Sequence, residues 1–304
     1  MYAPLGALLH LMARLPFGAL YVLSDVIYFI IYHLVGYRKR VVWNNLRESF
    51  PEKSDAEVKQ VMRGFYHFLA DYFVETIKLL HVSDDEMRRR FVFHNVELID
   101  RCFDERRSIV IYAAHYGNWE WLPSVTLWSR HDFSSDVFSE VYRPLKNEWF
   151  DALFLKLRSR FNTLNFTKKS VFRDLIRLKH AGKLSITGFM SDQHPSLNDD
   201  GYLTRFLNHD TAMITGTETL ARRLDFAVLY FEIVRKRRGY YECTVREVAL
   251  HPGDEPQGAI TERYTRMLEA QIRQQPEIWL WTHKRWKHKV TLNPNNENKD
   301  NGKD

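Results

Sequence analysis

Stretches of apolar, β-branched residues alternate along the chain with stretches of helical periodicity, and this alternation most constrains the fold. Continuous apolar runs at residues 108–114 (SIVIYAA), 184–190 and 227–233 predict strands that are buried on both faces, as in a parallel sheet. A fourth, more alternating strand is predicted at residues 240–248. Helical patterns occupy residues 150–158, 171–180 and 214–224. We therefore predict an α/β fold, a sandwich around a largely parallel central sheet.

The N-terminal region holds an apolar segment of membrane-spanning length. Residues 15–35 carry Asp25 as their only full charge, and Arg38, Lys39 and Arg40 follow directly. A helix of this length can cross a bilayer core, and the basic residues would keep the rest of the chain on the cytoplasmic side. Asp25 also favours an alternative, a helix that is buried or lies in the membrane interface, so both arrangements stay open.

Length and composition set the domain organisation. With 304 residues, of which 45% are hydrophobic, the chain can form one large domain with an appended anchor, which we favour over two domains. We predict an N-terminal membrane-anchoring helix over residues 1–40 and an α/β domain over residues 41–292. Residues 293–304 are mostly Asn, Lys and Asp, and we predict that they form a disordered tail.

Cysteine usage and charge limit the kinds of site. Cys102 and Cys243 stand far apart, and the sequence has neither a CxxC pair nor histidines at zinc spacing. We therefore predict no disulfide, no metal and no cofactor. The formal charge of +6 indicates acidic partners, which include anionic lipids, nucleic acid and an acidic carrier protein.

A histidine and an acid stand five positions apart in HYGNWE, at His115 and Glu120. Three other pairs share this spacing, so spacing alone is weak evidence. Five residues on a continuous helix leave two side chains about 140° apart, so a turn must intervene for them to meet. Only His115 directly follows a strong apolar strand, with Gly117 to permit a bend and Asn118 as an expected N-cap. This places His115 at the carboxyl end of a sheet strand, where α/β folds build their sites.

An imidazole held by a carboxylate can take a proton from a hydroxyl that attacks an activated acyl group. The sequence has no GxSxG, HExxH or P-loop pattern and no cysteine near His115. This argues against serine and cysteine hydrolases, zinc proteases and P-loop NTPases, and favours direct transfer without a covalent acyl-enzyme. A structural hydrogen bond is the alternative explanation of such a pair.

The segment YAAHYGNWEW at residues 112–121 resembles the HX4(D/E) motif of the lysophospholipid acyltransferase superfamily, in the branch that adds secondary acyl chains to lipid A. Three further similar segments follow in the expected order, at residues 141–147 (VYRPLKN), 191–193 (SDQ) and 278–287 (IWLWTHKRWK). The resemblance covers nearly the whole chain, including the N-terminal apolar helix.

The resemblance implies that His115 is the general base, Glu120 its orienting carboxylate, and Arg143 a group that binds substrate or stabilises charge. A guanidinium suits phosphates and developing oxyanions, although a surface ion pair would also explain Arg143. Asp192 follows the predicted strand at residues 184–190 and should lie near His115 if the sheet is parallel there; capping of the next loop is an equal alternative. Further candidates for substrate binding are Asn118, Lys146, Asn147, Asp192 and Gln193.

The resemblance further implies an acyl carrier protein thioester as donor and a hydroxyl of a membrane glycolipid, a lipid A precursor, as acceptor. It places the enzyme at the cytoplasmic face of a bacterial inner membrane, on the membrane surface and without a nucleic-acid partner. Residues 205–210 depart from the turn that this family usually has, which leaves the acceptor and the acyl chain length open.

Three other functions remain open: acyl transfer to a lysophospholipid or aminoacyl lipid, non-catalytic membrane binding, and nucleic-acid binding. The Trp-rich, basic segment 279–289 (WLWTHKRWKHK) suits an anionic membrane interface or a nucleic acid. A buried tryptophan segment with a solvated basic end would have the same composition.

Overall fold

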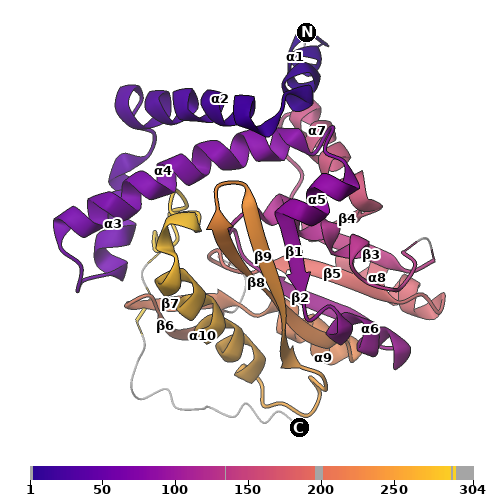
Figure 1. Ribbon diagram of the computed structural model, residues 1–304. Coiled ribbons are helices and arrows are strands. Elements are labelled where there is room, and N and C mark those ends of the chain that lie inside the picture. Colours follow the sequence, from indigo (N-terminus) through magenta and orange to yellow (C-terminus); the bar gives the residue numbers. More distant parts are fainter. Residues whose placement is uncertain (1–2, 134, 196–200, 289, 292–304) are drawn as a thin grey trace.

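The computed structural model describes residues 3–133, 135–195, 201–288 and 290–291. Its centre is a seven-stranded sheet in the order β1-β9-β8-β2-β5-β3-β4 (Figure 1). All neighbouring strands are parallel except β8 and β9, which form an antiparallel hairpin. The strands are β1 (Phe91–His94), β2 (Ile109–Ala113), β3 (Val137–Tyr142), β4 (Leu164–Thr167), β5 (Ser185–Met190), β8 (Ala227–Arg237) and β9 (Tyr240–Ala249).

The predicted α/β fold with a largely parallel sheet is confirmed. All five residues of β2 are buried, as a strand at the centre of a two-sided sheet requires. Most of the helices that follow β1 lie between strands in sequence: α6 (Glu97–Asp104), the 3₁₀ helix η2 (Trp119–Leu127), α7 (Glu148–Arg158), the 3₁₀ turn η3 (Ser159–Phe161), α8 (Val171–His180) and α9 (Gly216–Leu224). Helix α10 (Ala259–Gln274) and the 3₁₀ turn η4 (Pro276–Ile278) follow the last strand, β9. Tyr264 of α10 stacks on Tyr112 of β2, so α10 covers the middle of the sheet.

Four of the predicted strands are present, but five others were not predicted. They are β1, β3, β4 and the separate hairpin of β6 (Gly201–Phe206) and β7 (His209–Ile214). Residues 205–210, which depart from the usual turn of the family, form the end of this hairpin. Its turn residues, Leu207 and Asn208, have positive φ angles of 49° and 64°. Residues 293–304, predicted to be a disordered tail, lie outside the described residues.

The N-terminal helices lie together on one side of the sheet domain: α1 (Ala3–Arg14), α2 (Phe17–Phe29), the π-helical η1 (Ile30–Leu34), α3 (Lys39–Ser49), α4 (Asp55–Lys78) and α5 (Asp84–Arg90). Helix α2 packs on α4 (Figure 1). Within the described part of the chain, one helical stretch, Phe17–Leu34, is long and apolar enough to cross a membrane, and 17% of it is buried. By length and composition alone, this is weak evidence of a span.

Candidate active site

His115 lies just beyond the carboxyl end of β2, as predicted. The chain turns sharply after it at Gly117, whose φ is +59° and where an added Cβ would stand 2.7 Å from Ile233. The main chain on both sides of the turn is held by the C-terminal segment, because Gly117 N–H donates to Ile278 (2.9 Å) and Leu280 N–H donates to His115 (3.0 Å). The backbone around the base is therefore fixed from two directions.

The carboxylate that contacts the His115 ring is Asp192, which follows β5. His115 Nδ1 lies 2.8 Å from Asp192 Oδ1, and the His115 main-chain N–H donates to Oδ2 at 3.1 Å. Trp279 Nε1 also donates to Oδ2, at 2.9 Å. Burial alone would raise the pKa of Asp192, but the His115 charge and these hydrogen bonds lower it below its usual value. An ionised Asp192 only accepts hydrogen bonds, so Nδ1 carries the proton and the Nε2 lone pair is left to act as a base.

The structure does not show the predicted contact between Glu120 and His115. Glu120 instead accepts two hydrogen bonds from Arg158, at 2.9 Å from Nε and 2.8 Å from Nη2, and one from Tyr72 at 3.4 Å. The physical reason is the direction of η2, which begins at Trp119 and turns the Glu120 side chain toward α4 and α7. The catalytic role of Glu120 stays a prediction. In the structure, its carboxylate binds Arg158 and Tyr72.

His115 and Glu120 line a cavity of about 820 Å³, a size typical of ligand sites. Arg143 and Gln193 line the same cavity, so the structure brings four of the predicted site residues together. Arg143 is exposed, while Gln193 Nε2 lies 3.4 Å from His115 Nε2. Much of the wall is apolar, including Leu122, Phe138, Val141, Phe154, Phe189 and Leu220.

The remaining predicted residues lie elsewhere. Asn118 has no exposed surface and donates to Glu75 at 2.8 Å, which places it behind the site rather than in contact with a substrate; it also makes no N-cap bond to η2. Asn147 Oδ1 caps α7 by accepting from the N–H groups of Trp149 and Phe150. Lys146 is exposed on the same loop, and the described lining of the cavity includes neither Lys146 nor Asn147.

Two cavity residues that sequence reasoning missed are Arg158 and Glu140. Arg158 pairs with Glu120, and its Nε lies 4.0 Å from Glu140. Burial raises the pKa of Glu140 to about 8, and the Glu120 charge adds to this effect against the opposing effect of Arg158. Glu140 lies within the strand β3 and Arg158 at the end of α7, and neither position has a local motif that marks it.

The Trp-rich C-terminal segment is largely interior. Trp279 is 3% exposed and Trp281 is fully buried, so these two side chains are not a membrane belt. Arg285 is also buried, and Trp286 stacks on His209. The structure supports the alternative of a buried tryptophan segment, and Trp279 serves the site through its bond to Asp192.

The sequence matches the family described as bacterial lipid A biosynthesis acyltransferase over residues 4–288. The chain belongs to this family. It is 24% identical over 281 residues to a lipid A biosynthesis palmitoleoyltransferase of Escherichia coli (strain K12), which covers 92% of this chain and 88% of that protein. A lipid A biosynthesis acyltransferase of Shigella flexneri is similar to the same extent. A lipid A biosynthesis lauroyltransferase of Escherichia coli (strain K12) is 22% identical over 280 residues, 92% of this chain and 89% of that protein.

Membership in the lipid A acyltransferase family identifies the chain as an acyltransferase, and the site geometry fits this chemistry. A histidine with one ring nitrogen bound to a buried carboxylate and the other ring nitrogen beside a cavity is arranged for general-base catalysis. Among the described residues, no group of three or more His, Cys, Asp or Glu side chains is placed to hold a metal ion.

Proposed function

We propose that the protein transfers a fatty acyl chain from an acyl carrier protein thioester to a hydroxyl of a membrane glycolipid, a lipid A precursor. The observation that carries the proposal is the His115 ring, held by Asp192 beside a large, mostly apolar cavity. The palmitoleoyl and lauroyl groups in the names of the relatives are fatty acyl chains, which agrees with the apolar wall.

In the proposed reaction, His115 Nε2 takes the proton of the acceptor hydroxyl as its oxygen attacks the thioester carbonyl. A C–O bond forms, the C–S bond breaks, and the leaving thiolate receives the proton from His115. Asp192 stabilises the imidazolium in between. Arg143, exposed at the cavity, would bind a phosphate or stabilise the oxyanion; this role follows from its donors and its place in the lining.

We propose further that the protein works at the cytoplasmic face of the inner membrane and that α2 lies in the membrane plane. On the side that faces the protein, Ser24 donates to Asp71 and Asp25 pairs with Arg238. Val22, Val26 and Phe29 are 66%, 51% and 53% exposed. An amphipathic helix with this division of side chains suits the interface rather than a span, because a crossing would carry α4 and its exposed Arg63 into the bilayer core.

The test is incubation of the purified protein with one labelled acyl-acyl carrier protein and three acceptors in turn: a lipid A precursor, a lysophospholipid and an aminoacyl lipid. Mass spectrometry should find the acyl group on the lipid A precursor. The variant His115→Ala should lower turnover by about 10²–10⁴-fold with unchanged thermal unfolding. Acylation of another acceptor would replace the proposed acceptor, and full activity of His115→Ala would contradict the mechanism.

A further inference from the structure

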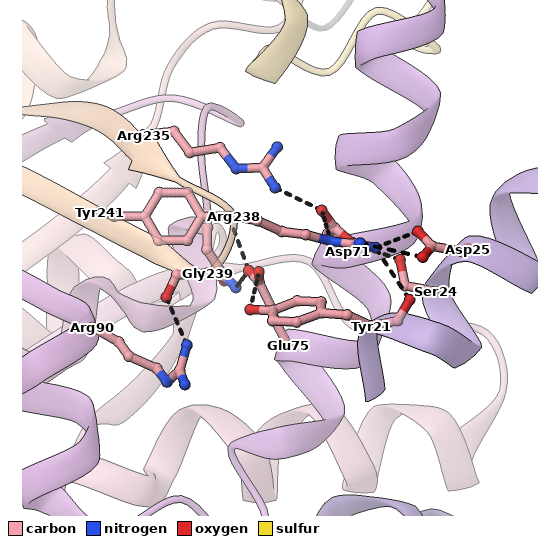
Figure 2. Close-up of polar contacts among 11 residues, drawn as sticks. Tyr21, Ser24, Asp25, Asp71, Glu75, Arg90, Arg235, Arg238, Gly239 and Tyr241 are labelled. Atoms are coloured by element: carbon pink, nitrogen blue, oxygen red, sulfur yellow. Dashed lines mark hydrogen bonds and ion pairs between the residues drawn. The ribbon is translucent and has the colours of Figure 1, made fainter. Parts of the chain in front are cut away.

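A polar cluster around two buried acids, which the proposed reaction does not use, joins the apolar helix α2 to residues 115–122. We call these residues the active-site loop; they carry His115 and Glu120 and include the first residues of η2. We call it the α4 cluster, because two acids of α4 are at its centre (Figure 2). It comprises Tyr21, Ser24 and Asp25 of α2, Asp71 and Glu75 of α4, Arg235, Arg238 and Tyr241 of the β8–β9 hairpin, and Asn118 of the loop.

The Asp71 half of the cluster holds α2 against the hairpin. Asp71 accepts hydrogen bonds from Ser24 at 2.6 Å, from Arg235 at 2.6 Å and from Arg238 at 2.7 Å. Arg238 also pairs with Asp25 at 2.6 Å (Figure 2). These contacts join α2, α4 and the β8–β9 hairpin, and none of them involves the active-site loop. They explain how α2 docks on the protein, but they do not connect α2 to the active site.

The Glu75 half reaches the loop. Glu75 Oε1 accepts from Tyr21 of α2 at 3.1 Å, while Oε2 accepts from Asn118 at 2.8 Å and from Tyr241 at 2.9 Å. The main-chain oxygen of Glu75 accepts from Trp121 Nε1 at 3.3 Å. One residue of α4 therefore holds the loop on both sides of Glu120.

Two details indicate that this connection is specific. Asn118 is fully buried and its Oδ1 has no partner among the described residues, so its bond to Glu75 is what orients the side chain. In the turn of the hairpin, a Cβ on Gly239 would stand 1.7 Å from the Tyr21 hydroxyl, and the φ of Gly239 is +73°. The turn is shaped to admit Tyr21, which therefore reaches Glu75.

The free energy of burying Glu75 argues against a role in packing alone. Burial raises the pKa of Glu75 to about 7, and the Asp71 charge adds to it, against the lowering effects of Arg235 and of the bonds from Asn118 and Tyr241. An acid held in so unfavourable an environment destabilises the fold, and such groups concentrate at functional sites.

We propose that Glu75 is a positioning residue that couples the seating of α2 on the protein to the geometry of the loop carrying His115 and Glu120. The proposal rests on the proposed acyl transfer, which supplies the activity that the loop would control. When Tyr21 withdraws with α2, Glu75 loses one of its three side-chain partners and the loop loses rigidity.

Three variants of the full chain in detergent test the coupling. Glu75→Gln keeps the shape but changes an acceptor into a mixed donor and acceptor, and Tyr21→Phe removes only the hydroxyl from α2. Ser24→Ala is the matched control, because it removes one bond between the same two helices without touching Glu75. We expect kcat to fall about 10- to 100-fold for Glu75→Gln and roughly three- to tenfold for Tyr21→Phe, with KM within about twofold.

Hydrogen–deuterium exchange gives a readout that does not depend on activity. Amides of residues 116–122 should exchange roughly tenfold faster in Glu75→Gln and Tyr21→Phe, and at the wild-type rate in Ser24→Ala. If the wild type transfers no acyl group, the proposed function fails while exchange still decides the coupling. Equal effects of Tyr21→Phe and Ser24→Ala on the loop, or none from either, would overturn the proposal even if Glu75→Gln fails to fold.

Discussion

At the scale of single residues, two carboxylates beside the cavity have different neighbours, and we therefore expect them to have different roles. Asp192 contacts the ring of His115, and Glu120 pairs with Arg158. The sequence motif joins His115 to Glu120 because the two stand close in the chain, whereas Asp192 follows a different strand. His115 and Asp192 could be predicted as neighbours from the parallel sheet; the orientation of each carboxyl group could not, because it depends on Arg158 and Trp279 from distant segments.

Substitution of the two acids should separate these roles. Asp192→Asn should lower kcat by roughly 10³–10⁴-fold, because an amide can donate to Nδ1 and stabilise the wrong tautomer. Glu120→Gln should mainly lower the melting temperature, because it removes the carboxylate that accepts two hydrogen bonds from the Arg158 guanidinium. Turnover and thermal unfolding of both variants check this. A larger loss of kcat in Glu120→Gln than in Asp192→Asn would identify Glu120, as first predicted, as the partner of the base.

Glu140 predicts a pH dependence of stability. Its folded pKa of about 8 exceeds the usual value of 4.5, so the folded state binds more protons than the unfolded state between these values and loses stability as pH rises through them. Glu140→Gln removes this loss. The difference in the free energy of unfolding, variant minus wild type, should therefore be larger at pH 9 than at pH 4 by roughly 3–5 kcal/mol. Denaturant titrations at both pH values measure it, and a constant difference would show that Glu140 ionises normally.

At the scale of elements, the strength of the local pattern decided which ones were predicted. Strands β2, β5 and β8 begin with continuous buried runs, and all three were found. Strand β3 also begins with three buried residues, but Ser139 and Glu140 interrupt its apolar sequence. Strand β4 is the edge strand and is only partly buried, so its sequence lacks a clear period. Strand β1 has four residues, too few for any pattern. Helix α2 was predicted from its apolar length, but its packing on α4 depends on Asp71 and Arg238, which are far away in sequence.

The exposed face of α2 predicts how the protein binds membranes. Val22→Asp combined with Val26→Asp should weaken partition into anionic vesicles more than tenfold, because burial of each apolar side chain contributes about 1.5–3 kcal/mol. Flotation of the protein with vesicles measures the bound fraction. Leu164→Asp is the control, since Leu164 is 46% exposed on β4, away from α2. Equal binding of the double variant and the control would place the membrane contact elsewhere.

At the scale of the whole molecule, the site is assembled from segments that span most of the chain. Tyr72 comes from α4, His115 follows β2, Arg158 ends α7, and Asp192 and Trp279 come from the second half. The strand ends could be predicted to meet because parallel strands share an edge. Tyr72, Arg158 and Trp279 could not be assigned to the site, because their contacts depend on how α4, α7 and the C-terminal segment pack around the sheet.

The net charge of +6 makes a prediction for the donor. If an acidic carrier protein docks on the basic molecule, attraction between the two surfaces speeds association and is screened by salt. The value of kcat/KM with acyl-acyl carrier protein should therefore fall roughly three- to tenfold between 50 and 500 mM NaCl, because the added salt screens the attraction between the two proteins. A pantetheine thioester of the same acyl chain has no carrier surface, so its kcat/KM should change less than about twofold over that range. A parallel fall for both donors would assign the salt effect to the acceptor lipid or to the cavity and would remove charge as the reason for using a carrier protein.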